Sequence, residues 1–501
     1  MTDPVLGDLA PAEVRVRFPP SPTGYLHLGN ARSALFNWVF ARHYGGRLVL
    51  RIEDTDIARN TEHGLASVLD SLRWLGIDWD EGPEAGGSYG PYIQSERYDV
   101  YADVSSRLLA AGHAYHCYCS PEELATRREA ARAEGRMSGY DGHCRSLNPQ
   151  RVDSFRSEGR EPVVRFRMPD QPIVFDDLVR GEITFQPENV PDYVLVRANG
   201  HPLYTLVNPV DDALMSITHV LRGEDLLSST PRQIALHAAL ADIGVGPGRI
   251  PRFGHLPMVM GPGNKRMSKR DADSPLVTYM RRGFLPEGML NYLALLGWGF
   301  SEDRDVFTMA EMQEAFDVRR VNPNPARFDL KKAEAINAAH LRLLQPDDLA
   351  TRIVPFLQDA GVLADEVAPE QREMLRAAVP LVQERMTTLG ESVGMLGFLF
   401  ADEASFHQDP ADANQLLDED GRGVVKAARE ALVQLADWDH ESIEVTLRTA
   451  LVEGLGLKPR HAFGPVRVAV TGRRVSPPLF ESMELLGRER SLARLASAQE
   501  G

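Results

Sequence analysis

The chain has 501 residues, 43% apolar and 25% charged, a balance typical of a folded globular protein and not of a disordered or fibrous one. At roughly 150 residues per domain, this length predicts about three or four domains. The formal net charge of −16 argues against a surface coated in basic charge for indiscriminate nucleic-acid binding, although a local basic face is compatible with it.

The compartment is predicted from the cysteines and the apolar segments. The chain has three cysteines, which fit a reducing compartment better than a disulfide framework. The first residues lack the apolar core of a secretion signal, and no run of about 18 apolar residues occurs. We therefore expect a cytoplasmic protein with no membrane or DNA partner.

The first elements form a strand, a helix and a second strand. Apolar residues alternate over 14–18, and the proline-rich segment 19–24 cannot be helical. A helix with apolar residues at three- and four-residue spacing follows and ends at Gly45, and residues 47–52 are β-like. This order predicts a βαβ unit and a parallel sheet.

The next segments interrupt that sheet. Residues 122–134 favour a helix, and short strands are expected over 163–167, 183–186 and 193–197, so residues 111–200 are interpreted as an insertion. A second βα pattern, a strand over 216–222 and a helix over 231–243, resumes the parallel sheet.

Past residue 275 the pattern is helical. Apolar residues recur at helical spacing over 349–360, 371–389 and 424–435. Residues 402–420 hold seven acidic side chains and no Lys or Arg, which predicts a linker between two helical subdomains.

Two short segments suggest a phosphate-binding site. His27, Gly29 and Asn30 lie where the first strand turns into the first helix, and a helix N-terminus offers free N–H groups to phosphate. Residues 265–270 include four cations, and the Gly-Pro-Gly segment before them favours a loop that can close over a triphosphate. The simpler alternatives are a capping histidine and a solvated surface loop.

Together the two segments resemble the paired motifs of class I aminoacyl-tRNA synthetases, and the chain as a whole resembles the bacterial glutamyl-tRNA synthetases. The resemblance covers the whole chain and is densest over 14–330. It rests on residues 17–24, 51–56, 140–142, 202–208, 220–225 and 291–298. Arg266 stands where the family usually has Lys, and Asn30 stands where its first motif ends in His, while Lys269 is retained.

The resemblance implies an α/β catalytic domain, a split Rossmann-type parallel sheet with an inserted α+β domain, followed by all-α C-terminal domains. It implies a split nucleotide-binding domain over 1–110 and 201–260, an inserted tRNA acceptor-end domain over 111–200, a stem-contact domain over 261–345, and helical anticodon-binding subdomains over 346–405 and 406–501.

The implied reaction joins L-glutamate to ATP, with Mg²⁺, as an acyl-adenylate and passes the glutamate to the 3′-terminal adenosine of tRNA(Glu). An enzyme that also charges tRNA(Gln), and a synthetase-derived RNA-binding protein without ligase activity, are the alternatives. A small nucleotidyltransferase would leave the helical C-terminal half without a role. A monomer is expected.

The resemblance also implies roles for individual residues. The catalytic residues are His27 and Lys269. The ATP-binding residues are Gly29, Asn30, Asp225, Val259, Ser268 and Lys269. The glutamate-binding residues are Arg17, Ser21, Glu53, Tyr204, Asn208 and Arg222. The permanent charge of Arg222 favours glutamate over glutamine, because an amide cannot neutralise it. For an isolated Arg17 and Glu53, a strand-end salt bridge is the simpler interpretation.

Cys117, Cys119 and Cys144 suggest a structural zinc site, which needs four ligands. His116 and His143 are conventional candidates for the fourth ligand, and the resemblance implies Tyr140. Three buried small apolar residues are the alternative.

The RNA is expected to contact the helical half. Residues 458–474 contain five Lys or Arg and no Asp or Glu, which suits phosphates, although a solvated helix and loop would look the same. Arg385 falls where the family reads the anticodon with an arginine, in an atypical context over 383–386.

Overall fold

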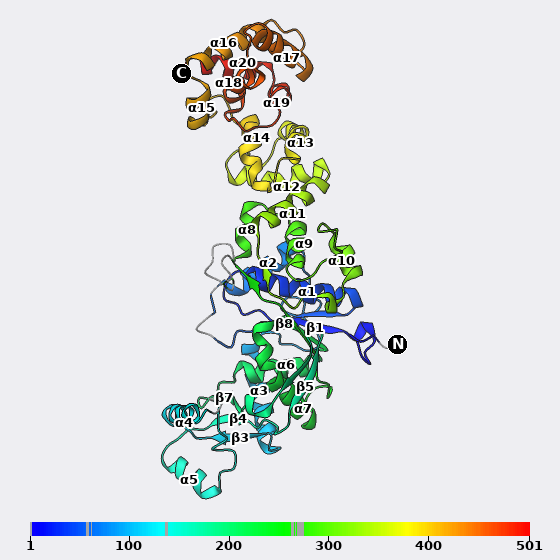
Figure 1. The fold of residues 1–501 in the computed structure, drawn as a ribbon, viewed down its shortest axis with the longest axis vertical. Coiled ribbons are helices and arrows are strands. Elements are labelled where there is room, and N and C mark those ends of the chain that lie inside the picture. Colours follow the sequence, from blue (N-terminus) through cyan, green and yellow to red (C-terminus); the bar gives the residue numbers. More distant parts are fainter. Residues whose placement is uncertain are drawn as a thin grey trace. The chain divides into compact units, whose positions relative to one another are not determined.

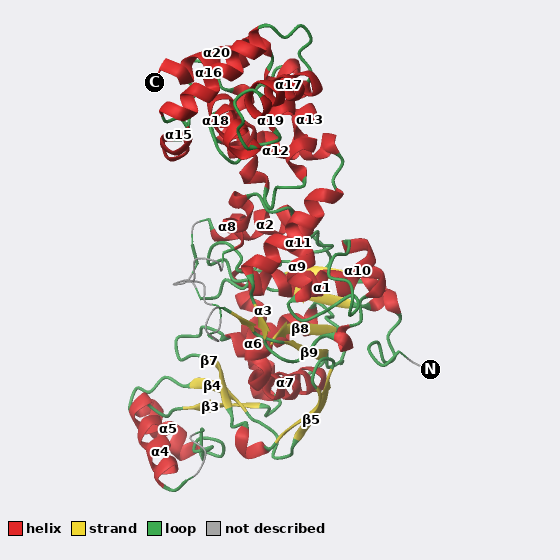
Figure 2. Ribbon diagram, turned by 45° about the horizontal axis from the view of Figure 1, so that its top comes forward, coloured by secondary structure: helices red, strands yellow, loops and turns green. Residues whose placement is uncertain are grey.

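The computed structural model describes residues 3–56, 60–61, 63–135, 139–261, 265, 267 and 275–500. The chain divides into two compact units (Figures 1 and 2). The first unit comprises Met1–Thr278 and Leu290–Asp329, and the second comprises Tyr279–Met289 and Leu330–Gly501.

The first βαβ unit forms as predicted. Strands β1 (Arg15–Phe18) and β2 (Arg47–Leu50) pair in parallel, and α1 (Leu28–Tyr44) connects them. The helix ends because Gly45 adopts a left-handed conformation with φ of 67°, which a residue without a side chain adopts at no steric cost.

A second parallel pair completes the split sheet. Strands β8 (His219–Gly223) and β9 (Arg252–Leu256) pair in parallel and are joined by α7 (Thr230–Asp242). The backbone N–H of Thr218 donates to the Arg15 carbonyl at 2.9 Å, so β8 lies beside β1 (Figure 1). The split parallel sheet expected from the sequence is therefore confirmed.

The intervening segment is α+β. Its antiparallel sheet contains β3 (Ala114–Cys117), β4 (Val163–Phe166) and β7 (Tyr193–Val196), and β5 (Ile173–Asp177) forms a hairpin with β6 (Gly181–Phe185). Its helices α4 (Pro121–Ala133) and α5 (Pro149–Ser157) lie beside that sheet in both views (Figures 1 and 2). The other elements of the first unit are α2 (Gly64–Leu75), α3 (Tyr98–Ala110), α4 (Pro121–Ala133), α5 (Pro149–Ser157), α6 (Tyr204–Leu214), β10 (Val259–Met260), α10 (Met309–Ala315) and β11 (Ala326–Arg327). Helices α8 (Leu276–Arg282) and α9 (Pro286–Leu295) follow the basic segment in sequence.

The regular elements in the described part of the second unit are all helices, and most of its buried apolar side chains form one core. Its helices are α11 (Leu330–Leu343), α12 (Pro346–Asp359), α13 (Pro369–Gln383), α14 (Ser392–Phe400), α15 (Pro410–Leu416), α16 (Glu419–Val433), α17 (His440–Leu447), α18 (Pro459–Thr471), α19 (Leu479–Leu486) and α20 (Arg488–Glu500). No helix among the described residues is both long and apolar enough to cross a membrane.

The prediction of a linker over 402–420 was wrong. This acidic stretch contains α15 and the start of α16. Asp409 accepts hydrogen bonds from the first N–H groups of α15, and Asp418 does the same for α16. The acidic side chains thus stabilise helix N-termini, where negative charge is favourable.

Candidate functional site

One cavity of about 1140 Å³, its open mouth included, lies at the carboxyl ends of β1 and β8. This is where ligands bind in open parallel sheets. The structure brings the sequence-predicted residues together in its wall: Arg17, Ser21, His27, Gly29, Asn30, Glu53, Tyr204, Asn208, Arg222, Asp225 and Val259. The remaining predicted residues, Ser268 and Lys269, lie outside the described residues.

The wall near α1 is built around His27. Its Nδ1 accepts a hydrogen bond from the backbone N–H of Asn30 at 3.3 Å, so the histidine caps the helix. A Cβ at position 29 would lie 3.1 Å from the imidazole ring, which explains why a glycine follows so closely. The capping role keeps Nδ1 unprotonated, so a neutral His27 carries its proton on Nε2.

Arg17 is anchored on one side and available on the other. Its Nε lies 3.2 Å from Asp212, which also pairs with Arg51 at 2.8 Å. Burial acts to raise the pKa of Asp212, but Arg17 and Arg51 hold that pKa below its ordinary value. The Nη1 group of Arg17 is buried and has no hydrogen-bond partner among the described residues.

Arg222 is held by neutral groups. Its guanidinium donates to the side chains of Gln233 (2.7 Å), Thr230 (2.8 Å) and His255 (3.2 Å) and to the Leu226 carbonyl (3.3 Å). It is only 5% exposed, and within the described part of the chain it forms no ion pair. A buried cation without a counter-ion strongly favours an anionic ligand.

Glu53 provides the opposite charge in the same cavity. Burial raises its pKa to about 7, although Arg51 and a hydrogen bond with Asn208 act against this. Its Oε1 is buried without a hydrogen-bond partner among the described residues. Asn208 in turn accepts a hydrogen bond from Gln94 at 2.9 Å. The cavity wall therefore contains both cationic and anionic side chains, an arrangement suited to an amino acid.

Sequence reasoning missed several residues that support this site. Asp212 orients Arg17. The sequence feature that could have identified Asp212 is a pair of adjacent acidic residues inside the otherwise apolar segment 206–213. Arg32 lines the cavity and donates to the carbonyls of Leu296 and Pro257. Nothing in the sequence of α1 distinguishes Arg32, because an arginine in a helix is normally exposed to solvent.

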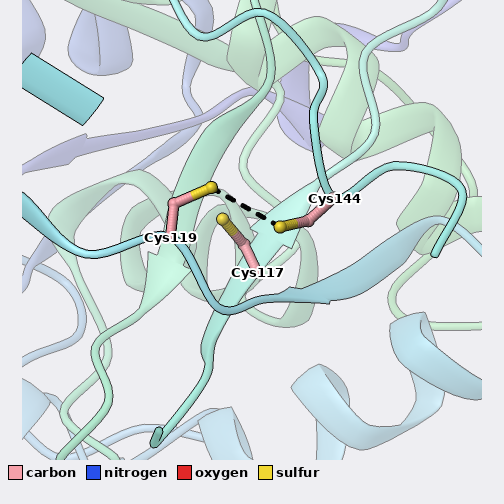
Figure 3. A group of neighbouring side chains, drawn as sticks. All are labelled: Cys117, Cys119 and Cys144. Atoms are coloured by element: carbon pink, nitrogen blue, oxygen red, sulfur yellow. Dashed lines mark hydrogen bonds between the residues drawn. The ribbon is translucent and has the colours of Figure 1, made fainter. Parts of the chain in front are cut away.

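The three cysteines converge, as predicted. Their sulfur atoms all lie within 4.8 Å of one another, and Cys119 is 3.5 Å from Cys144 (Figure 3). The Tyr140 hydroxyl oxygen lies 3.4 Å from Cys117 and 4.0 Å from Cys119 and accepts the backbone N–H of Cys144. This donor set of three thiols and one phenol oxygen fits a tetrahedral zinc ion. Among the described residues, no histidine joins the group.

The basic segment over 458–474 lies in the second unit. Lys458 and Arg460 are exposed at the start of α18, and Arg467 donates to Ser476. The guanidinium of Arg385, the predicted anticodon residue, donates a hydrogen bond to the backbone carbonyl of Ser476 at 2.8 Å. Arg385 therefore lies at the end of the basic segment.

Two family models match the chain. "tRNA synthetases class I (E and Q), catalytic domain" matches residues 13–335, and "Anticodon binding domain" matches residues 348–499. The fold and the cavity thus have the class I synthetase organisation.

Relatives with known names agree. A glutamate–tRNA ligase of a Nocardioides species is 61% identical over 488 residues, covering 97% of this chain and 99% of the relative. That of Saccharopolyspora erythraea is 61% identical over 482 residues, covering 96% and 95%. The crystal structure of a glutamate tRNA ligase from Elizabethkingia meningosepticum matches with a TM-score of 0.82 at 32% identity, covering 97% and 99%. The chain belongs to the glutamate–tRNA ligases.

Proposed function

We propose that the enzyme activates L-glutamate with the magnesium complex of ATP and transfers the glutamate to the 3′-terminal adenosine of tRNA(Glu). The observation that carries this proposal is Arg222, a buried cation in the cavity wall whose partners among the described residues are all neutral. A ligand with a carboxylate side chain supplies the missing negative charge, and a ligand with an amide does not.

Different residues of the cavity bind different groups of the amino acid. Arg222, with Arg17 and Tyr204, surrounds the side-chain carboxylate, and Glu53 holds the ammonium. Four of the five N–H groups of Arg222 are already used within the protein, so it offers one N–H and its charge. Arg17 adds its Nη1, which has no hydrogen-bond partner among the described residues. Ser21 and Asn208 supply neutral hydrogen bonds.

The nucleotide lies at the start of α1, next to the amino acid. The α-carboxylate of glutamate attacks the α-phosphorus of ATP, the bond to pyrophosphate breaks, and glutamyl-adenylate forms. His27 and Lys269 stabilise the charge that develops on the phosphorus centre. Gly29, Asn30, Asp225, Val259 and Ser268 contact ATP. A ribose hydroxyl of tRNA then attacks the carbonyl carbon, and AMP leaves.

We propose that the cysteine group holds a structural zinc ion through Cys117, Cys119, Cys144 and Tyr140. The sulfur spacing and the phenol oxygen support this set. When bound, the metal would join β3 to the segment around residue 144.

The helical half of the chain contacts the tRNA. Arg385 reads the anticodon, and the exposed cations of the basic segment contact phosphates. The second candidate acceptor is tRNA(Gln), because the context of Arg385 over 383–386 is atypical. The domain limits expected from the sequence, a monomeric state and a cytoplasmic location remain predictions.

Aminoacylation of separated tRNA(Glu) and tRNA(Gln) tests this proposal directly. We expect glutamate to be attached to tRNA(Glu), and attachment to tRNA(Gln) would identify the broader enzyme. ATP–pyrophosphate exchange, with and without tRNA, tests the alternative without ligase activity. No exchange under either condition would overturn the proposed function.

A further inference from the structure

Asp177 and His255 form a buried pair behind Arg222. Asp177 is the last residue of β5, and His255 lies in β9. The carboxylate Oδ2 is 2.5 Å from His255 Nδ1, and His255 Nε2 is 3.2 Å from Arg222 Nε. Both side chains are fully buried, and neither lines the cavity.

The hydrogen bonds assign the tautomer of His255. The Nε–H of Arg222 can only donate, so Nε2 of the imidazole must accept, and the Thr230 hydroxyl lies 2.9 Å from the same nitrogen. The proton is then on Nδ1 and is donated to Asp177. Burial lowers the pKa of His255, in keeping with a neutral ring.

The other oxygen of Asp177 is held by the backbone. Its Oδ1 accepts from the N–H groups of Val179 (3.0 Å), Arg180 (3.0 Å) and His255 (3.2 Å). Because three donors converge on Oδ1, only Oδ2 is available to the imidazole.

We propose that Asp177 and His255 are positioning residues for glutamate selection: Asp177 fixes the tautomer of His255, and His255 fixes the orientation of the Arg222 guanidinium. This inference deepens the proposed function and rests on it. A carboxylate in direct contact with Arg222 would also orient it but would neutralise its charge. An interposed neutral imidazole orients the guanidinium and leaves its charge for the substrate.

The opposite tautomer would disrupt this arrangement. A proton on Nε2 would face the Nε–H of Arg222, donor against donor. The guanidinium would have to turn, and its bonds to Gln233 and Thr230 would be lost with it. The pair therefore acts on substrate selection through Arg222 and does not touch the substrate.

The substitution D177N is designed to reverse the tautomer of His255. The three backbone donors keep the amide oxygen at the Oδ1 position, so the amide NH₂ faces His255 Nδ1, which must then accept. We expect KM for glutamate to rise, and the kcat/KM ratio of glutamate over glutamine to fall, each by about tenfold or more. KM for ATP should stay within about twofold, since Arg222 is not among the residues proposed to bind the nucleotide.

Two substitutions of His255 separate positioning from simple structural support. H255Q places an amide oxygen near the position of Nε2 and keeps the acceptor for Arg222. H255N retains an amide near Nδ1 but loses that acceptor. We expect H255Q to keep the glutamate preference within about threefold of the unsubstituted enzyme, and H255N to lose it as D177N does. This pair decides the question even where D177N does not fold.

The control is H219N, which removes another fully buried imidazole, from the neighbouring strand β8. It should leave the glutamate preference unchanged. The inference is overturned when the unsubstituted enzyme charges glutamate but H255Q and H255N have the same preference, or D177N folds and retains the original one. Failure of the unsubstituted enzyme to activate glutamate would instead reject the proposed function.

Discussion

At the scale of single residues, Arg222 and Glu53 are two charged groups of the cavity wall whose charges respond differently to pH, so they lead to different predictions. Arg222 keeps its charge at every pH at which the protein folds, because a guanidinium does not release its proton. Glu53 is a carboxyl group whose pKa burial has raised to about 7, so its charge depends on pH in the physiological range.

The charge of Arg222 should set the amino-acid preference. R222A should lower the kcat/KM ratio of glutamate over glutamine by at least about 100-fold, roughly 3 kcal/mol, as expected when a charged hydrogen-bonded pair is lost. R222K keeps the charge but not the planar group, so its kcat/KM ratio should lie between those of the unsubstituted enzyme and R222A. Steady-state kinetics with both amino acids measures the ratio. If R222A keeps the original ratio, the selector is another residue, with Arg17 the leading candidate.

The charge of Glu53 should make glutamate binding depend on pH. The ammonium of glutamate needs the ionised carboxylate, so affinity is full above the raised pKa and decreases as the pH falls through it. We expect KM for glutamate to rise about tenfold between pH 8 and pH 6, at saturating ATP and tRNA. E53Q is the control, since it cannot ionise and should show a high KM without this step. A step that persists in E53Q would belong to another group.

At the scale of elements, the sequence predicted helices and strands correctly where several local features favour the same structure. The unit β1–α1–β2 formed as expected because apolar alternation, a proline-rich turn and a terminal glycine all favour it. The acidic stretch over 402–420 was misread, because the same composition suits a solvated linker and a pair of helix caps.

The cavity could be predicted only in part, for a physical reason. The family motifs identified residues of its wall, whose roles remain predictions. Asp212 and His255 act through contacts to residues 195 and 33 positions away, and nothing in their local sequence specifies such contacts. Burial turns an ordinary aspartate or histidine into a positioning residue, and burial at this distance is a property of the fold.

The cysteine group also belongs to the scale of elements, because it brings the end of β3 next to a segment 25 residues further along the chain. Protein purified without chelator should contain about one zinc per chain, and C117S should lose it, as measured by elemental analysis. Y140F should release zinc to a chelator faster than the unsubstituted protein. H143A is the matched control, since this exposed histidine lies outside the group and its loss should not matter. Zinc-free, active protein with three free thiols would contradict the site.

At the scale of the whole molecule, the distribution of charge matters more than its sum. A chain of net charge −16 repels RNA at long range, so it needs a confined cationic surface to bind phosphates. The exposed Lys458 and Arg460 offer one in the described part of the second unit, close in sequence to the segment that holds Arg385 in place.

The double variant K458A/R460A should therefore weaken tRNA binding without affecting the chemistry. We expect KM for tRNA to rise about tenfold, and the slope of log KM against log salt to decrease by about 1.5 to 2, because two phosphate contacts are lost. KM for glutamate and for ATP should not change, since the cavity proposed to bind both is lined by residues of the first unit. R422A/K426A removes two cations elsewhere in the same unit, with the same change in net charge, and should leave KM for tRNA near its original value. An equal effect of both double variants would mean that net charge, and not a local phosphate-binding surface, controls tRNA association.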